Sequence, residues 1–281
     1  MTEDATATTV VVAVDGSQAA TNALRWAIGE AAGRQAALRI VYAAGDDDLP
    51  AGDIRRAFDA AERSLRFATD VVTEVGKSVA VETEILWGPV SAVLIHESRT
   101  ATLLCVGAVG ADGHPGEVMG TTAAALAENA YCPVSIIRGP RVGPAGGVDW
   151  IVVAVNDRPD NDAVIECTLN EARLRHAPVL AVGVGAEDLG ETTYQELDRR
   201  IEKWKLRNPD IRIHGVACMG SVGQYLQSHA TESVQLAVLG GNDVDQIAYL
   251  VWPHNQSAAP RGERSILIVP HPVTVGAESA V

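Results

Sequence analysis

The sequence predicts an α/β fold with two tandem doubly wound (Rossmann-like) domains, each with a five-stranded parallel sheet. Three observations support this prediction. Strand and helix patterns alternate along the chain, a five-stranded unit recurs, and a linker rich in Gly and Pro separates the two copies. The length of 281 residues fits two domains of ordinary size. The expected strand order in each sheet is 3-2-1-4-5.

The first half contains five apolar, strand-like runs, at 10–14, 38–43, 79–86, 102–108 and 133–138. Continuous β-branched runs such as VVVAV are typical of strands buried on both faces. Apolar residues at helical spacing predict four helices between these strands. Ser17 is expected to cap the first helix and Gly33 to end it, and a long second helix should run from about Asp53 to Gly76. The other two helices should follow Pro89 and cover 121–130.

The second half repeats the first after the linker at 139–147. The run WIVVAVNDR (150–158) aligns with VVVAVDGS and places Asn156 on Asp15, 141 residues later. The segment at 219–230 aligns with 87–98 at an offset of 132. The second copy is therefore shorter by about nine residues, in the loop and helix after its second strand. We predict domains at 1–140 and 148–281, the second a degenerate copy of the first.

Charge and composition bear on the class of partner. Asp and Glu number 36 against 22 Lys and Arg, and the net charge of −14 would repel nucleic acid and anionic membranes. No apolar run is long enough to span a membrane, and the N-terminal residues do not resemble a signal peptide, so we predict a cytoplasmic protein. The widely separated Cys105, Cys132, Cys167 and Cys218 are interpreted as small buried hydrophobes.

The segment VGAVGADGHPGEVMGTT (106–122) is the candidate ligand-binding motif of the sequence. Its glycines lie between a strand and a helix that begins with two hydroxyl residues: Gly107, Gly110, Gly113, Gly116, Gly120, Thr121 and Thr122. Glycines let backbone N–H groups converge, and a helix start adds free donors and partial positive charge, which favours phosphate binding. The alternative is a surface loop without a ligand. The Lys of a Walker loop is missing, and a Rossmann dinucleotide loop would follow the first strand instead.

The spacing G-x2-G-x9-G-[S/T], met by Gly107, Gly110, Gly120 and Thr121, resembles the nucleotide-binding motif of ATP-binding universal stress proteins. The sequences DGS (15–17), LRWA (24–27) and CPV (132–134) are similar to that family as well. The resemblance covers 9–138 closely and 149–270 more loosely, as in tandem members of the family.

The resemblance implies a role for each end of the site. Asp15 would contact the adenosine moiety, and Ala43 would meet adenine through its backbone. The alternative for Asp15 is a turn or capping residue, but its place at the carboxyl end of the first strand favours a ligand contact.

The phosphates of ATP would lie in the loop from Gly107 to Gly120, which includes Gly113, against the hydroxyls of Thr121 and Thr122. A Mg²⁺ ion is expected to bridge the phosphate oxygens. No catalytic residue and no protein metal ligand is assigned.

The second half departs from this pattern at the adenosine end, where 156–158 read Asn-Asp-Arg instead of the Asp-Gly-Ser of 15–17. It also departs in the loop, because Asp243 stands at the position of Gly110, and Pro253 and His254 at those of Gly120 and Thr121.

These loop changes act against phosphate binding. Asp243 and Asp245 are expected to repel phosphate, and Pro253 removes an N–H donor. We therefore predict that the second half does not bind nucleotide.

The sequence indicates an ATP-binding stress-response regulatory protein that senses or sequesters adenine nucleotide through its first domain. Slow ATP hydrolysis and a nucleotide-independent interaction scaffold remain alternatives. Asp112, His114 and Glu117 could orient a water, but no second group nearby fixes such a role, so they are interpreted as solvated loop residues. Trp252 and His254 could mark a partner surface; we interpret them as packing residues.

The resemblance also bears on assembly. The fifth strands of this family often pair across subunits, so 133–138 and 265–269 are the expected seam of an internal pseudo-dimer. A homodimer of the whole chain and an unknown protein partner are left open, and His271 is interpreted as an exposed tail residue.

Overall fold

The computed structural model describes residues 8–45, 51–111, 119–139, 148–183, 191–218, 220–228, 233–246 and 265–270. The first half consists of β1 (Thr9–Ala13), α1 (Gln18–Arg34), β2 (Ala37–Ala43), α2 (Ala51–Val75), β3 (Val81–Leu86), α3 (Val90–Glu97), β4 (Leu103–Gly107), α4 (Thr121–Asn129) and β5 (Val134–Ile137). The second consists of β6 (Asp149–Val155), α5 (Asn161–Arg175), β7 (Val179–Gly183), α6 (Glu191–Arg207), β8 (Ile213–Ala217), α7 (Val222–Ser228), β9 (Ser233–Gly240), the 3₁₀ helix η1 (Gly241–Gln246) and β10 (Ser265–Val269).

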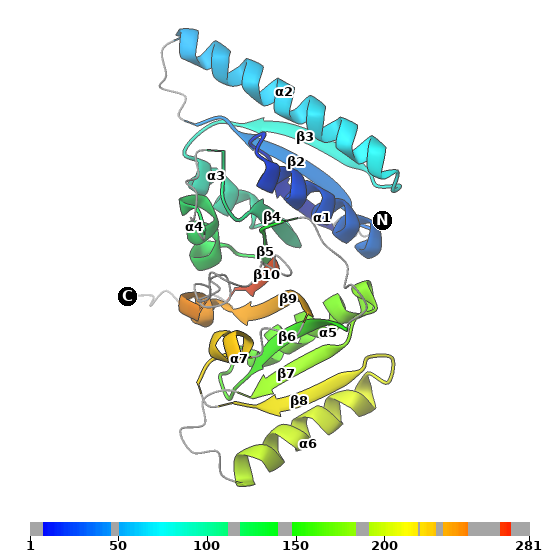
Figure 1. Cartoon of the computed structure of the whole chain (residues 1–281). Helices are drawn as coiled ribbons and strands as arrows, with labels where there is room; N and C mark the ends of the chain where they lie inside the picture. Colours follow the sequence, from blue (N-terminus) through cyan, green and yellow to red (C-terminus); the bar gives the residue numbers. More distant parts are fainter. Residues whose placement is uncertain are drawn as a thin grey trace, which may run out of the picture.

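The strands form one continuous ten-stranded sheet in the order β3-β2-β1-β4-β5-β10-β9-β6-β7-β8 (Figure 1). Each half has the predicted order 3-2-1-4-5, with parallel pairing between its own strands. The α/β fold with two Rossmann-like halves is thus confirmed.

The two halves join where β5 pairs with β10 in antiparallel fashion, with Ile136 opposite Ile266. This is the seam between 133–138 and 265–269 that the family resemblance implied. Because the strands of the two halves run in opposite directions, their carboxyl ends lie at opposite edges of the sheet.

Helices cover both faces of the sheet, which explains the continuous apolar strands. Helices α1, α2, α5 and α6 pack on one face, where they share a core with Val10 and Val12 of β1. Helices α3, α4 and α7 pack on the other face, where Val11 of β1 points.

The end of α1 differs from the prediction. Ser17 caps its start as expected, because its hydroxyl accepts a hydrogen bond of 3.0 Å from the N–H of Ala20. Gly33 does not end the helix, which continues to Arg34 and stops at Gln35 in the left-handed conformation. Gly33 instead lies against Leu174 of α5, whose side chain a Cβ at that position would overlap. The glycine therefore serves contact between the two halves.

The cysteines behave largely as predicted. Cys105 and Cys132 are buried, whereas Cys167 and Cys218 are half-buried. Burial raises the pKa of Cys132 and of Cys167 to about 12, which keeps both thiols protonated at neutral pH. In the described part of the chain, no helix has the length and apolar character needed to cross a membrane.

Gly29 and Gly33 of α1 provide a test of the contact between the halves. Gly29→Ala should raise the free energy of unfolding by about 0.5–1 kcal/mol, because Ala favours helix and the nearest atom to the new Cβ is the Lys77 Nζ at 3.6 Å. Gly33→Ala should instead lower it by about 1 kcal/mol, through overlap with Leu174.

Urea unfolding of these variants, with and without Leu174→Ala, gives a double-mutant cycle. In the Leu174→Ala background the Gly33→Ala change should become stabilising. An equal effect of Gly33→Ala in both backgrounds would contradict the assignment.

Candidate functional site

The candidate site lies at the carboxyl ends of the neighbouring strands β1 and β4. These strands pair in parallel, with Val12 opposite Cys105, and the connections after them lead to opposite faces of the sheet. Such a switch point leaves a crevice at the edge of the sheet, where doubly wound folds bind ligands. Asp15 follows β1 at this edge, and Gly107 is the last residue of β4.

The carboxylate of Asp15 links the turn after β1 to the loop after β4. Its Oδ1 accepts a hydrogen bond of 2.9 Å from the N–H of Ser17, which is the turn role left open by the sequence. Its Oδ2 accepts a second bond, of 2.8 Å, from the N–H of Ala111 in the loop after β4. The loop contact goes beyond the turn role and fixes Ala111, where the loop begins, relative to the end of β1. The sequence contained no signal for Ala111, because only its backbone takes part.

Two of the predicted glycines permit this close approach. A Cβ on Gly107 would lie 2.8 Å from the carbonyl carbon of Ala19 and 2.9 Å from the nitrogen of Ala20 at the start of α1. A Cβ on Gly110 would lie 3.0 Å from the Asp15 Oδ2. Larger residues at either position would push the loop away from α1 and from Asp15.

Helix α4 begins at Thr121, as predicted, with Gly120 as its N-cap residue and without a side-chain cap. The N–H of Gly120 donates 2.7 Å to the carbonyl of Ala108 and so closes the loop. The next three N–H groups, of Thr121, Thr122 and Ala123, have no acceptor among the described residues. They form a group of free donors at the positive end of a helix dipole.

Ala43, the last residue of β2, lies on the other side of β1. Residues of β2 alternate in direction: the Val41 carbonyl accepts from Val14 on the β1 side, whereas the Ala44 N–H donates to Leu86 on the β3 side. The N–H and carbonyl of Ala43 therefore face the β1 side, beyond the last residue pair of β1 and β2, Ala13 with Val41. Both groups are directed toward the edge that carries Asp15.

Several residues of the sequence hypotheses lie outside the described residues. In the first-half loop these are Asp112, Gly113, His114, Gly116 and Glu117. In the second half they are Trp252, Pro253, His254 and His271, and the side chain of Asp245 is likewise outside the description.

The corresponding edge of the second half keeps the turn and adds an ion pair that the first half does not have among its described residues. The Asn156 Oδ1 accepts from the N–H of Arg158 at 3.0 Å, which reproduces the bond between Asp15 and Ser17. The Arg158 Nη1 then donates 2.8 Å to the buried carboxylate of Asp243. Asp243 is therefore not the repelling negative charge that the sequence predicted. Its charge is neutralised by Arg158, and the ion pair itself fills this part of the edge.

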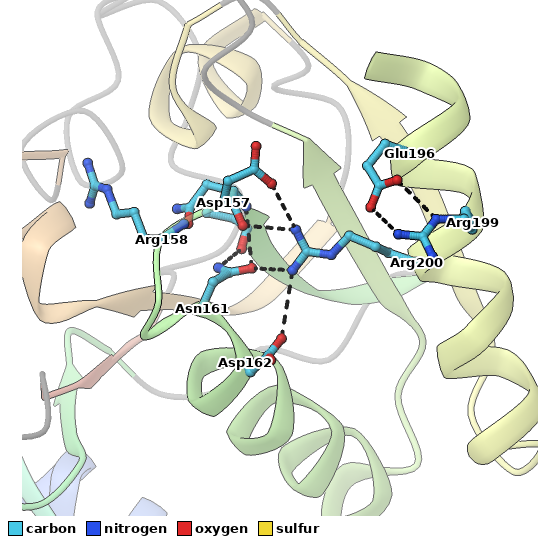
Figure 2. A network of polar contacts seen from close by, with 9 residues as sticks. Asp157, Arg158, Asn161, Asp162, Glu196, Arg199 and Arg200 are labelled. Carbon is cyan, nitrogen blue, oxygen red and sulfur yellow. Dashed lines mark hydrogen bonds and ion pairs between the residues drawn. The ribbon is translucent and has the colours of Figure 1, made fainter. Parts of the chain in front are cut away.

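A second arginine reaches the same edge from α6 (Figure 2). The Arg200 Nη1 donates 2.9 Å to the carbonyl of Asn156, and Nη2 donates 3.1 Å to the Oδ1 of Asn161. Asp157 and Asp162 lie 3.6 and 3.9 Å from the same guanidinium. The group is thus held by acceptors on three sides.

Sequence reasoning missed Arg200, although the repeat contained a signal for it. At the offset of 132 that relates β3 to β8, Arg200 corresponds to Ala68 of α2. Ala68 is buried and has no atoms beyond Cβ, so it sends nothing toward Asp15. The two edges therefore differ in the loop sequence and also in the helix side chain at this position, which is an arginine in the second half and an alanine in the first.

The comparisons with known proteins identify the family of the chain. Residues 6–138 match the model of the universal stress protein family. A universal stress protein from Mycobacterium tuberculosis (strain ATCC 25618 / H37Rv) is 41% identical over 261 residues, which are 93% of this chain and 96% of the relative. This chain belongs to the universal stress protein family.

Other relatives support a tandem universal stress protein. A second one from the same strain is 36% identical over 268 residues, which cover 92% of this chain and 95% of the relative. The crystal structure of a universal stress protein from Archaeoglobus fulgidus DSM 4304 covers 94% of this chain and 96% of its own, with a TM-score of 0.71 and 14% identity. That structure shows the shared fold across both halves.

Gly107 and its counterpart Gly240 test the close approach at the first edge. Gly107→Ala should lower the free energy of unfolding by about 1–3 kcal/mol, because the new methyl group meets the backbone of α1. Gly240→Ala should change it by less than about 1 kcal/mol, since its nearest neighbour, the Val164 Cγ2, lies at 3.4 Å. Chemical unfolding followed by circular dichroism measures both values. Equal losses would show that β4 approaches α1 no more closely than β9 approaches α5.

Proposed function

We propose that this universal stress protein binds an adenine nucleotide, ATP with Mg²⁺, at the edge of its first half, and acts as a stress-response regulator that senses or sequesters the nucleotide. The hydrogen bond from the Ala111 N–H to the Asp15 Oδ2 carries the proposal. It ties Ala111, at the start of the glycine-rich loop, to the strand end expected to meet adenosine, and the loop leads on to the start of α4.

At the phosphate end, the N–H groups of Thr121, Thr122 and Ala123 supply donors that need an acceptor. Anions bind at such helix starts because N–H groups and the helix dipole both favour negative charge. The hydroxyls of Thr121 and Thr122 add donors at the same place. Mg²⁺ keeps much of its coordination to phosphate oxygens and water, so it needs few protein ligands here.

At the adenosine end, the N–H of Ala43 offers a donor and its carbonyl an acceptor, and both face the β1 side of the strand. The edge of adenine that carries N1 and the 6-amino group offers the complementary acceptor and donor. The exposed carboxylate of Asp15 lies between this end and the phosphate loop, where ribose hydroxyls would find an acceptor. The three parts together match the components of a nucleotide in their order.

The second half differs from the first in the described part of its own edge. The pair of Arg158 and Asp243 fills the place of the Ser17 hydroxyl and of Gly110. Arg200 takes the carbonyl of Asn156, and its charge is met by two aspartates, so it is not available to a phosphate. The proposal therefore assigns one nucleotide to each chain.

Isothermal titration calorimetry of the whole chain with ATP and Mg²⁺ tests the proposal. The expected result is one site per chain. Gly120→Asp should remove it without changing the circular dichroism spectrum, because a Cβ there has no atom nearer than 3.7 Å, while the new carboxylate repels phosphate. Absence of heat with the wild type would contradict the nucleotide site, and two similar sites would contradict the asymmetry.

Asp15→Ala tests the role of the carboxylate in the same titration. The variant should bind ATP more weakly by about 1.5–3 kcal/mol, because it loses a charged acceptor and the tie to Ala111. Asn156→Ala, at the corresponding place in the second half, is the matched control and should leave the affinity unchanged. An unaltered dissociation constant for Asp15→Ala would reduce Asp15 to a turn residue.

A further inference from the structure

Helices α1 and α5 meet across the seam and carry a repeated pair of charged residues. Glu30 and Arg34 on α1 recur 141 residues later as Glu171 and Arg175 on α5, at the offset that relates β1 to β6. The antiparallel joining of the halves brings these two pairs together at the centre of the molecule.

The four side chains form a closed ring of ion pairs, called the seam ring below. Arg34 binds Glu30 of its own helix at 3.1 Å and also binds Glu171 across the seam. Arg175 lies 3.0 Å from Glu171 of its own helix and also binds Glu30 across the seam. Each arginine thus bridges both helices, and each carboxylate faces two guanidinium groups.

The carboxylates are the most deeply buried members of the seam ring. The side chains of Glu30 and Glu171 are each 1% exposed, whereas that of Arg34 is 27% exposed. Arg175 is buried at 8% exposure, and its guanidinium stacks on the ring of Trp26 at 4.2 Å. Two negative charges in such dry surroundings are costly, while water reaches part of the Arg34 charge.

The protonation of Glu171 reflects this burial. Burial raises its pKa to about 7, with a further increase from the nearby Glu30, against the opposing effect of Arg175 and Arg34. Titratable thiols also face the seam ring, from Cys105 on β4 and Cys167 on α5.

These thiols do not titrate in the same range. Burial raises the pKa of Cys167 to about 12 and that of Cys105 well above its usual value, so both stay neutral. Glu171 is therefore the group of the seam ring whose charge changes between mildly acidic and neutral pH.

We propose that the buried Glu171, which lies between Arg34 and Arg175, takes up a proton at the seam, and that this proton acts as a pH-sensitive lock between the two halves. With the proton, an O–H donor replaces the repulsion between two buried carboxylates, and the remaining positive charge resides on the partly solvated Arg34. Without it, both carboxylates are charged in a dry interface, and α1 and α5 are held less tightly.

The direction of the pH effect follows from linkage. A carboxyl with a higher pKa in the folded chain binds its proton more tightly there than in the unfolded chain. Its contribution to stability is therefore complete below the ordinary pKa of 4.5 and is lost as the pH rises to about 7. Above that pH the contribution stays constant.

Thermal unfolding of the whole chain between pH 4.5 and 8, at constant ionic strength, tests the lock. Glu171→Gln keeps the shape and a hydrogen-bond donor but cannot titrate. The melting temperature of the wild type, relative to that of this variant, should fall by several degrees from pH 4.5 to 7 and then level off. Glu74→Gln, which removes an exposed carboxylate paired with Arg25, is the control and should follow the wild type. Parallel curves for wild type and Glu171→Gln would overturn the proposal.

A second measurement needs no variant and therefore does not depend on its folding. In wild-type protein with ¹³C-labelled glutamate carboxyls, one carboxyl signal should titrate near pH 7. Amides of α1 and α5 should exchange faster at pH 8 than at pH 5.5 after correction for intrinsic rates, whereas amides of α6 should not. Titration of all carboxyl signals below pH 6 would overturn the proposal. None of these measurements uses nucleotide, so their outcome is independent of the proposed function.

Discussion

The antiparallel pairing of β5 with β10 is the constraint on which the rest of the structure depends. It joins two five-stranded sheets into one and removes an exposed edge from each half. It also reverses the strand direction between the halves. The strands of the first half therefore end at one border of the sheet, and those of the second half end at the opposite border. A ligand at the first edge therefore cannot touch the second edge directly. Any communication between them has to pass through the seam.

The same pairing brings α1 and α5 into contact, and the sequence has adapted to that contact. Gly33 leaves space for Leu174, and the seam ring of Glu30, Arg34, Glu171 and Arg175 pairs the charges that meet there. Buried ion pairs add little net stability compared with apolar packing, because removing charges from water is costly. Their fixed geometry does specify how the two helices lie against each other.

The two halves share one structural unit but differ at the edges where their first strands end. Strand order and the turn after the first strand are the same in both. The edges differ because the first keeps small residues near the strand ends, such as Gly110 and Ala68. The second half has Asp243 and Arg200 at the corresponding positions. Asp243 pairs with Arg158, and Arg200 binds the carbonyl of Asn156, so larger side chains occupy this edge.

The sequence alone determined the alternation of strands and helices, the duplication and the Ser17 cap, because these follow from local periodicity and repetition. The segments that form the seam were expected from the resemblance to universal stress proteins. The sequence also placed Asp15, Gly107, Gly120 and Thr121 at one edge, since parallel strands bring their carboxyl ends together. Only the tertiary structure decided what Gly33, Asp243 and Arg200 do. Their roles depend on partners far away in the sequence, on Leu174, Arg158 and Asn156. Only the tertiary structure shows the hydrogen bond from Ala111 to Asp15 as well, because a backbone N–H carries no sequence signature.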